Sequence, residues 1–391
     1  MEQEIISKEK KATRLLVDAH VFDGIFQGSR TFLKGVYSHF ETEKYGVQVF
    51  LAANNIDNLE EEFANLPNIE FVQLKSTNKF YRLAWEIPKL IRDLQIDFAH
   101  FNYYLPLTLS SNCNYIITIH DVLFLDYPHY FPKSYVLKNK LLFGWAAKRA
   151  ELLNSVSDYS VDRIRDNFNI PSKKMAILPN AIDERFFEDR SKDKDREYIK
   201  KKYGIADFIL YVSRWEPRKN HIALLQAYSN LRLWEKNIEL IFIGKKAIAN
   251  PELDNFLQEV LEKSGQKVHH ISYIDQDDLV VFNNAAQLSV FPSLCEGFGI
   301  PPLESAALRT PTICSNLTAM KEFSFFGKYH IDPRENAMLE TSIEELLQEI
   351  QEDTLQNQLT IISETIRLKY RWEFAANVLA ESIKRSKGKI E

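Results

Sequence analysis

The sequence is poor in cysteine and shows no spacing typical of a structural metal site. Only Cys113, Cys295 and Cys314 occur among the 391 residues. Their number is odd and they form no C-x-x-C pair, so neither a disulfide framework nor a zinc site is indicated. We therefore expect a protein of a reducing cytoplasm.

The chain also lacks a long apolar run. The longest stretch without Asp, Glu, Lys or Arg, residues 98–120, contains Asn, Ser and Pro side chains and is too polar for a membrane span. The first residues, MEQEIISKEKKATR, are charged where a secretory signal needs an apolar core. These residues are expected to form a solvated arm, and no segment is predicted to cross a bilayer.

An excess of positive charge is missing as well. Lys and Arg number 49 against 54 Asp and Glu, which gives a net charge of −5. Nucleic-acid-binding proteins need a basic field, so this class is disfavoured and any basic surface must be local. With 45% hydrophobic and 26% charged residues, the chain has the balance of a globular protein with more than one domain.

Short apolar runs alternate with helix-length amphipathic segments along the chain. Runs predicted to be buried parallel strands are 14–18, 47–53, 69–74, 98–102, 115–121, 152–157 and 175–180, then 208–213, 239–244, 268–273, 289–293 and 311–316. The charged segment 184–203 interrupts this pattern and indicates a linker. We predict two doubly wound α/β domains, 1–190 and 191–391, facing each other across a cleft at the carboxyl ends of their strands. A final helix, 372–390, is expected to pack back on the first domain.

The segment 289–316 carries the most specific pattern. It reads as a strand, a loop with two glycines, a helix and another strand, with Glu296 in the loop and Glu304 in the expected first helical turn. A carboxylate in a first turn also acts as an ordinary helix cap, which is the alternative for Glu304. That alternative leaves the acidic, flexible loop at Glu296 unexplained, because such a loop lets backbone approach a ligand.

The string EGFGIPPLE resembles the E-x7-E signature of retaining, GT-B-fold glycosyltransferases of family 4. The resemblance implies that Glu304 holds the ribose hydroxyls of a nucleotide-sugar and that Glu296 contacts hydroxyls of the donor sugar. The intervening Gly297, Phe298, Gly299 and Ile300 are implied as donor contacts. A carboxylate accepts hydrogen bonds from vicinal hydroxyls in pairs, which agrees with these roles.

A second pattern, YVSRWEPRKN at 211–220, follows a predicted strand and precedes a predicted helix. The resemblance implies that Arg214 and Lys219 bind the donor diphosphate, where positive charge stabilises the leaving group. A solvated basic loop is the alternative. Arg218 lies close enough in sequence to be mistaken for either residue.

Two first-domain segments extend the resemblance over most of the chain. The loop DGIFQGSRTFLKG at 23–35 is similar to the family's glycine loop, in which Gly28 would approach the donor phosphates. The strand YIITIHD ends in His120 and Asp121. A structural histidine is the alternative there, but the resemblance implies that His120 lies beside the reacting centre, with Asp121 as its neighbour or orienting group. The catalytic residues implied are His120, Asp121, Glu296, Arg214 and Lys219.

Many other sugar transferases hold a divalent cation with an Asp-x-Asp pair, and two such strings occur in this sequence. Residues 193–195 lie in the predicted linker, and residues 275–277 open a predicted helix, where acids act as caps. No metal or other cofactor is therefore expected, because Arg214 and Lys219 would stabilise the leaving group.

The sequence thus predicts a retaining, metal-independent hexosyltransferase. Its donor would be of the UDP-glucose or GDP-mannose type, and its acceptor a hydroxyl of a glycan or lipid-linked saccharide. A glycoside hydrolase, a sugar-nucleotide epimerase and a non-catalytic nucleotide-sugar-binding protein are the alternatives. Residues 130–149 mix aromatic and basic side chains, so they form either an ordinary amphipathic helix or a peripheral contact with the inner face of the cytoplasmic membrane.

Overall fold

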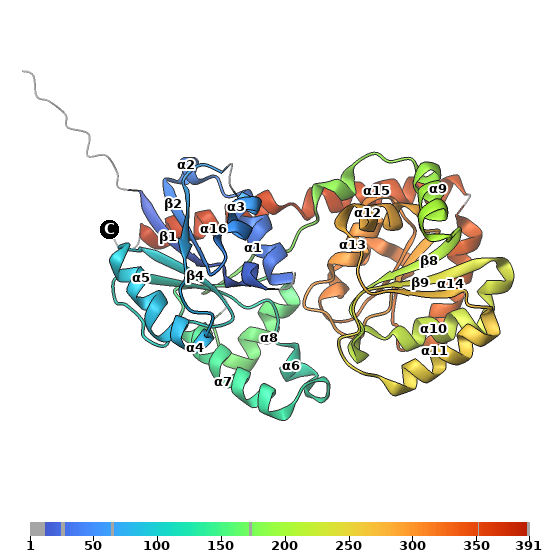
Figure 1. Cartoon of the computed structure of the whole chain (residues 1–391), viewed down its shortest axis with the longest axis horizontal. Helices are drawn as coiled ribbons and strands as arrows, with labels where there is room; N and C mark the ends of the chain where they lie inside the picture. Colours follow the sequence, from blue (N-terminus) through green and yellow to red (C-terminus); the bar gives the residue numbers. More distant parts are fainter. Residues whose placement is uncertain (1–11, 25–27, 64–65, 172–173, 351, 389–391) are drawn as a thin grey trace, which may run out of the picture. The chain divides into compact units, whose positions relative to one another are not determined.

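The computed structural model describes residues 12–24, 28–63, 66–171, 174–350 and 352–388 (Figure 1). Residues 1–11 of the predicted arm, residues 25–27 of the glycine loop and the end of the last predicted helix lie outside these residues, while Thr13 and Arg14, also predicted in the arm, belong to β1. The first unit comprises the described residues of Met1–Leu125, Pro132–Pro179 and Trp372–Glu391, and the second those of Asp126–Phe131 and Asn180–Arg371. Apart from the short segment 126–131, the chain passes to the second unit at 179–180, somewhat before the predicted 190, and returns to the first unit for its last helix.

The first unit is built on a seven-stranded parallel sheet of order β3-β2-β1-β4-β5-β6-β7. The strands are β1 Thr13–Asp18, β2 Val47–Ala53, β3 Ile69–Gln73, β4 Phe98–Asn102, β5 Asn114–Thr118, β6 Leu152–Ser155 and β7 Met175–Ile177. The strand order reverses between β1 and β4, which is where doubly wound sheets bind ligands beyond their carboxyl ends. The predicted strand 115–121 ends earlier, so His120 and Asp121 follow β5 instead of closing it.

Helices flank this sheet. They are η1 His20–Asp23, α1 Gly28–Ser38, α2 Thr42–Tyr45, α3 Ile56–Phe63, α4 Lys79–Tyr81, the π-helical η2 Arg82–Glu86, α5 Ile87–Asp93, α6 Leu123–Asp126, α7 Lys133–Arg149, α8 Asp158–Phe168 and α16 Trp372–Lys387. The last helix packs against α1 so closely that a Cβ on Gly35 would lie 2.1 Å from the Trp372 ring. Glycine is therefore required where these two helices meet.

The second unit has a six-stranded parallel sheet of order β10-β9-β8-β11-β12-β13. The strands are β8 Asp207–Val212, β9 Ile238–Ile243, β10 Val268–Ile271, β11 Leu288–Phe291, β12 Thr312–Ser315 and β13 His330–Ile331. Strand β13 was not predicted from the sequence. Fully buried side chains such as Phe208, Leu210 and Ile241 explain why these runs form interior strands.

Helices cover both faces of the second sheet, with α10, α11 and α14 on one side and α9, α12 and α13 on the other (Figure 1). The helical segments of the second unit are η3 Pro128–Tyr130, η5 Glu184–Phe187, α9 Lys192–Tyr203, η6 Pro217–Lys219, α10 His221–Asn230, η7 Leu233–Lys236, α11 Pro251–Ser264, α12 Gln276–Ala285, α13 Ile300–Ala307, η8 Thr318–Glu322, η9 Ser324–Tyr329, α14 Asn336–Glu349 and α15 Asp353–Lys369.

The prediction of a linker at 184–203 is wrong in part, because most of this charged segment is α9. Ser191 caps the helix by accepting a hydrogen bond from the Lys194 backbone N–H, and Ile199 is fully buried. One buried stripe is enough to dock a helix whose other faces are charged and solvated. Within the described ranges, no helix combines the length and the apolar character that a membrane span requires.

Candidate active site

In the second unit, the loops after β8 and β11 bring opposite charges together. Glu296, which follows β11, forms ion pairs with Arg218 and Lys219 of η6. The Arg218 guanidinium lies 3.0 Å from Glu296 Oε2 and also donates to the Cys295 carbonyl oxygen at 2.9 Å. The structure therefore joins the two patterns that the sequence analysis treated separately, at the sheet edge where parallel α/β folds bind ligands.

The electrostatics of this cluster fix the charge of Glu296. Burial alone would raise the pKa of the carboxyl, but the adjacent Lys219 and Arg218 charges lower it to about 2. The pKa of Lys219 is lowered by burial, although Glu296 opposes that effect. A carboxylate held ionised by two cations accepts hydrogen bonds and does not act as a general acid near neutral pH.

Arg214 is placed differently from Lys219. Its side chain is 65% exposed and lies 3.4 Å from the Glu216 carboxylate. Glu216 also accepts from Arg218 Nε at 2.8 Å, so this acid links both arginines. Among the described residues, Glu296 thus contacts Arg218 and Lys219, while Arg214 faces solvent; the sequence spacing could not distinguish the two arginines.

The loop carrying these cations is anchored by the strands beside it. Tyr211 of β8 donates through its hydroxyl to the Lys219 carbonyl oxygen at 2.6 Å. Gly244, directly after β9, has a φ of 141°, and a Cβ there would lie 2.1 Å from the Ser213 carbonyl oxygen. Only glycine permits this approach, which fixes the course of the loop after β8.

Glu304 is the fifth residue of α13, beyond the first turn in which it was expected. The capping alternative therefore loses its basis, because the free N–H groups belong to the first turn. Burial, with a smaller contribution from the Asp183 carboxylate, raises the pKa of Glu304 to about 7, while Arg185 opposes the shift. Arg185 is itself bound by Asp183, through Nε and a terminal nitrogen at 2.9 Å each, and by Asp277 at 3.1 Å.

The residues between the two glutamates shape the loop. Phe298 is buried, with its ring centroid 5.7 Å from those of Phe323 and Tyr370. Gly299, the N-cap of α13, has a φ of 107°, and a Cβ there would lie 2.7 Å from Met320 Cγ. Gly297 and Ile300 are partly exposed. Phe298 thus anchors the loop, and Gly299 allows the sharp turn that starts the helix.

In the first unit, His120 lies two residues beyond β5 and is buried. Its Nε2 is 3.1 Å from Asn102 Oδ1, and the Phe32 ring packs edge-on at 4.9 Å. Burial lowers the pKa of His120 to about 4, so the imidazole is neutral at pH 7. Asp121 accepts a hydrogen bond from the Leu123 backbone N–H at 3.1 Å. Gly28 is the exposed first residue of α1, and no atom of the described residues would crowd a Cβ there.

A charged group at the end of β1 was missed by the sequence analysis. The buried Asp18 carboxylate lies 3.0 Å from His20 Nδ1 and 3.6 Å from the Arg82 guanidinium. Close by, Lys79 Nζ lies 3.1 Å from the centroid of the Tyr104 ring, and burial followed by the charges of Lys138 and Arg82 lowers the pKa of Lys79 to about 8. An Asp as the last residue of a strand was the only sequence signal for this group.

The Asp-x-Asp strings do not present paired open carboxylates. Asp195 lies on α9 and accepts from Arg190 at 2.9 and 3.1 Å. Asp275 caps α12, and Asp277 contacts Arg185. These arrangements are those of helix capping and ion pairing, and the expectation of a metal-free site stays a prediction.

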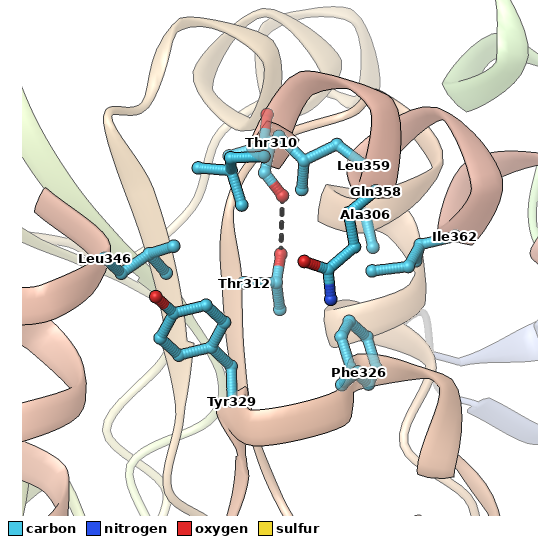
Figure 2. Close-up of a pocket in the computed structure, with 10 residues that line it drawn as sticks. Ala306, Thr310, Thr312, Phe326, Tyr329, Leu346, Gln358, Leu359 and Ile362 are labelled. Carbon is cyan, nitrogen blue, oxygen red and sulfur yellow. Dashed lines mark hydrogen bonds between the residues drawn. The ribbon is translucent and has the colours of Figure 1, made fainter. Parts of the chain in front are cut away.

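Figure 2 shows a small cavity that is lined by side chains of α13, β12, η9, α14 and α15. The wall is mostly apolar and includes Phe326, Leu346 and Ile362, with Thr312 donating to the Thr310 carbonyl oxygen at 2.8 Å. The volume of about 10 Å³ holds about one water molecule, and none of the lining side chains is charged. This cavity is therefore a packing feature and not a substrate site.

Two family models match the chain in succession. Residues 28–186 match the model described as Glycosyltransferase Family 4, and residues 193–359 match Glycosyl transferases group 1. An Escherichia coli protein named O-antigen chain mannosyltransferase B is 28% identical over 298 residues, which cover 75% of this chain and 74% of that protein. O-antigen chain mannosyltransferase RfbU of Salmonella typhimurium is 24% identical, over 76% of this chain and 79% of its own.

Solved structures match in fold. Sucrose-phosphate synthase from Thermosynechococcus elongatus has a TM-score of 0.74 and 15% identity, covering 97% of this chain and 100% of its own. HepE of Anabaena in complex with UDP and glucose has a TM-score of 0.70 and 14% identity, covering 96% and 100%. At these identities the likeness establishes the pair of Rossmann-like units alone.

Proposed function

The chain belongs to the glycosyltransferases of family 4, and we propose that it transfers a hexose from a nucleoside diphosphate sugar to a hydroxyl of a glycan or lipid-linked saccharide in polysaccharide biosynthesis. The observation that carries this proposal is the ion-pair cluster of Glu296 with Lys219 and Arg218 at the carboxyl ends of β8 and β11. The names of the curated relatives favour mannose, hence a GDP-mannose type of donor over UDP-glucose.

The cluster suits a diphosphate. Lys219 is a compact cation that is largely buried, and Arg218 is a planar cation that binds two oxygens at once. In the absence of donor, both neutralise Glu296. When the diphosphate occupies the cations, the Glu296 carboxylate becomes available to accept from hydroxyls of the donor sugar. Arg214, on the same loop and exposed, would add charge from the solvent side.

Glu304 suits the ribose. Its carboxyl has a pKa of about 7, so about half of the molecules carry the negative charge at neutral pH. Two vicinal hydroxyls donating to this carboxylate would stabilise the ionised form. The backbone of Gly297 to Ile300 would then line the donor between the two glutamates.

We further propose retention of the anomeric configuration without a metal ion. The acceptor oxygen forms its bond to the anomeric carbon on the face from which the diphosphate oxygen departs, and the acceptor proton passes to that departing oxygen. No enzyme carboxylate attacks the sugar on this route, so Glu296 accepts hydrogen bonds from sugar hydroxyls and is not a nucleophile. Lys219 and Arg218 would stabilise the charge that develops on the diphosphate. His120, neutral at pH 7, would hydrogen-bond a substrate hydroxyl, with Asp121 beside it.

The donor proposal is tested by thermal unfolding in EDTA with GDP, UDP, ADP and their hexose conjugates. A ligand at about 100 times its dissociation constant adds about 2.7 kcal/mol to the free energy of unfolding. We expect a shift with one base that Glu304→Gln and Lys219→Ala reduce and that Lys200→Ala, a change of an exposed lysine on α9, leaves intact. Absence of any shift with the wild type would reject the donor assignment.

The products separate this function from its alternatives. Transfer from the bound donor to a saccharide, with the anomeric configuration read by NMR, supports a retaining transferase. Glycan cleavage without nucleotide-sugar would indicate a hydrolase, conversion of the donor sugar without acceptor an epimerase, and binding without turnover a non-catalytic protein.

A further inference from the structure

The charged group at the end of β1 contains a buried arginine that is only loosely paired. The Arg82 side chain is 5% exposed, and a terminal nitrogen lies 3.6 Å from the Asp18 carboxylate, which is beyond hydrogen-bond distance. Asp18 also lies 3.0 Å from His20 Nδ1. Arg82 Nε is buried and has no hydrogen-bond partner among the described residues. Because a guanidinium carries five N–H donors, this buried cation keeps donors for a further acceptor.

A second cation, Lys79, stands beside this arginine. It lies three positions before Arg82, a spacing that brings side chains together on a helix surface, and its Nζ is 3.1 Å from the centroid of the Tyr104 ring. Burial, followed by the charges of Lys138 and Arg82, lowers the pKa of Lys79 to about 8, while Asp18 opposes the shift. The three cations are therefore close enough to repel one another.

The group has an excess of positive charge that a phosphate ester balances. Arg82, Lys79 and the exposed Lys138 carry three positive charges when protonated. The pKa of Asp18 is lowered although burial opposes the shift, so this carboxylate supplies one negative charge. With His20 neutral, the excess is two positive charges. A phosphate monoester carries about two negative charges near neutral pH and matches this excess, whereas a carboxylate carries only one.

The group lies where the first sheet reverses its strand order. Asp18 is the last residue of β1, Tyr104 follows β4 by two residues, and these two strands are neighbours at the reversal. Doubly wound sheets bind ligands beyond the carboxyl ends of their strands at such a point. In the proposed reaction the donor diphosphate is held by residues of the second unit. The ligand of this site is therefore assigned to the acceptor.

We propose that Arg82 and Lys79 bind a phosphate group of the saccharide acceptor. Arg82 presents parallel N–H groups to two phosphate oxygens, and Lys79 presents a compact charge to a third. A neutral saccharide would leave both cations without a counter-ion. The assignment to the acceptor rests on the proposed function, whereas the anion site itself rests on contacts within the first unit.

Calorimetry on the full chain at pH 8 tests the proposal with mannose 1-phosphate, methyl mannoside and inorganic phosphate. We expect the phosphorylated sugar to bind at least about tenfold more tightly than methyl mannoside. Lys79→Gln should weaken its binding about tenfold, and Arg82→Lys, which keeps the charge but loses the planar donors, should also weaken it. Lys89→Gln, which changes a 70% exposed lysine of α5, and Lys219→Ala in the donor site should leave this affinity unchanged.

Proton uptake gives a second readout, which a merely structural role of Lys79 would not produce. About half of the Lys79 amines are protonated at pH 8, and a bound phosphate raises their pKa. Binding should therefore take up as much as about half a proton, measured in buffers of different ionisation enthalpy, and Lys79→Gln should remove this uptake. The phosphate ester, with a second pKa of about 6, is already ionised at pH 8.

The proposal is overturned if mannose 1-phosphate binds no more tightly than methyl mannoside, or if Lys79→Gln weakens its binding no more than Lys89→Gln does. Loss of binding in Lys219→Ala but not in Lys79→Gln would assign the phosphate to the donor site. Inorganic phosphate that binds as tightly as the sugar phosphate would overturn the assignment to the acceptor. If Arg82→Lys does not fold, Lys79→Gln alone decides.

The donor proposal is tested separately in the same variants. The nucleotide-induced thermal shift should persist in Lys79→Gln, because Lys79 belongs to the first unit. A nucleotide shift without binding of the sugar phosphate would reject the anion site alone. Binding of the sugar phosphate that depends on Lys79, without any nucleotide shift, would reject the donor assignment and leave the anion site standing.

Discussion

Replacing Glu296 by glutamine tests the charge balance of the candidate donor site. The substitution keeps the size of the side chain and removes the charge that Lys219 and Arg218 contact. The side chains of the three residues are at most 19% exposed, so water compensates the two cations poorly once the carboxylate is gone. We expect a loss of stability at neutral pH, because an uncompensated buried charge is costly.

The magnitude follows from the pKa of Glu296, which is lowered from 4.5 to about 2. One pKa unit corresponds to about 1.36 kcal/mol, so the ionised carboxylate contributes on the order of 3 kcal/mol to the free energy of unfolding. The folded state has the lower pKa. The contribution is therefore present above pH 4.5 and disappears as the pH falls toward about 2.

Denaturant unfolding of the wild type and Glu296→Gln at neutral pH and at about pH 3 measures both effects. The difference between the two proteins should shrink at the acidic pH. Glu235→Gln is the control, because Glu235 pairs with Arg232 on the surface, with half or more of each side chain exposed, and such pairs contribute about 1 kcal/mol or less. The ionised buried pair would be refuted if Glu296→Gln lowered the free energy of unfolding by the same amount at both pH values, or by no more than Glu235→Gln does.

Three further predictions concern the rest of the site. Donor affinity should rise between about pH 6 and 8 as Glu304 ionises, and Glu304→Gln should remove this dependence, measured by calorimetry. Gly299→Ala should lower the free energy of unfolding by about 1–3 kcal/mol because of its positive φ, whereas Gly28→Ala should change it by less than about 0.5 kcal/mol; denaturant titration compares them. Arg218→Ala should lower the melting temperature and Arg214→Ala should not, because only the former is mostly buried; equal shifts would contradict this.

The fold was largely predictable because parallel strands are buried on both faces and read as continuous apolar runs. The runs at 47–53 and 98–102 coincide with β2 and β4. The short β13 has only two residues and left no such signal. Helix α9 was missed because its apolar stripe is narrow, with Ile199 and Asp195 as its buried residues. The many charged residues lie on the solvated faces of this helix, so the sequence indicated a linker and the buried face was not recognised.

The sequence nominated candidate site residues, which stay predictions, but it did not indicate the contacts that they make. The spacing of Glu296 and Glu304 marked both carboxylates, yet nothing in the sequence showed that Arg218 would contact Glu296. That contact joins residues 78 positions apart in the chain, and Arg218 lies in η6, which ends at Asn220 with a left-handed φ of 57°. The pairing of Asp18 with Arg82 was also hidden, since it joins segments far apart in the chain.

The charge count of the cluster leads to a last prediction about Lys219. Arg214, Arg218 and Lys219 carry three positive charges against the two negative charges of Glu216 and Glu296, which leaves one positive charge before donor binds. In the proposed transfer the diphosphate gains negative charge as its bond to the sugar breaks, so its attraction to these cations would grow toward the transition state.

Lys219→Ala should therefore lower kcat more than it raises KM, and Lys219→Arg should restore part of the rate because it keeps the charge in a different geometry. Steady-state kinetics with saturating acceptor measures the split. An increase in KM with unchanged kcat would mean that Lys219 holds the donor equally in the ground state and the transition state, and would remove it from the stabilisation of the leaving group.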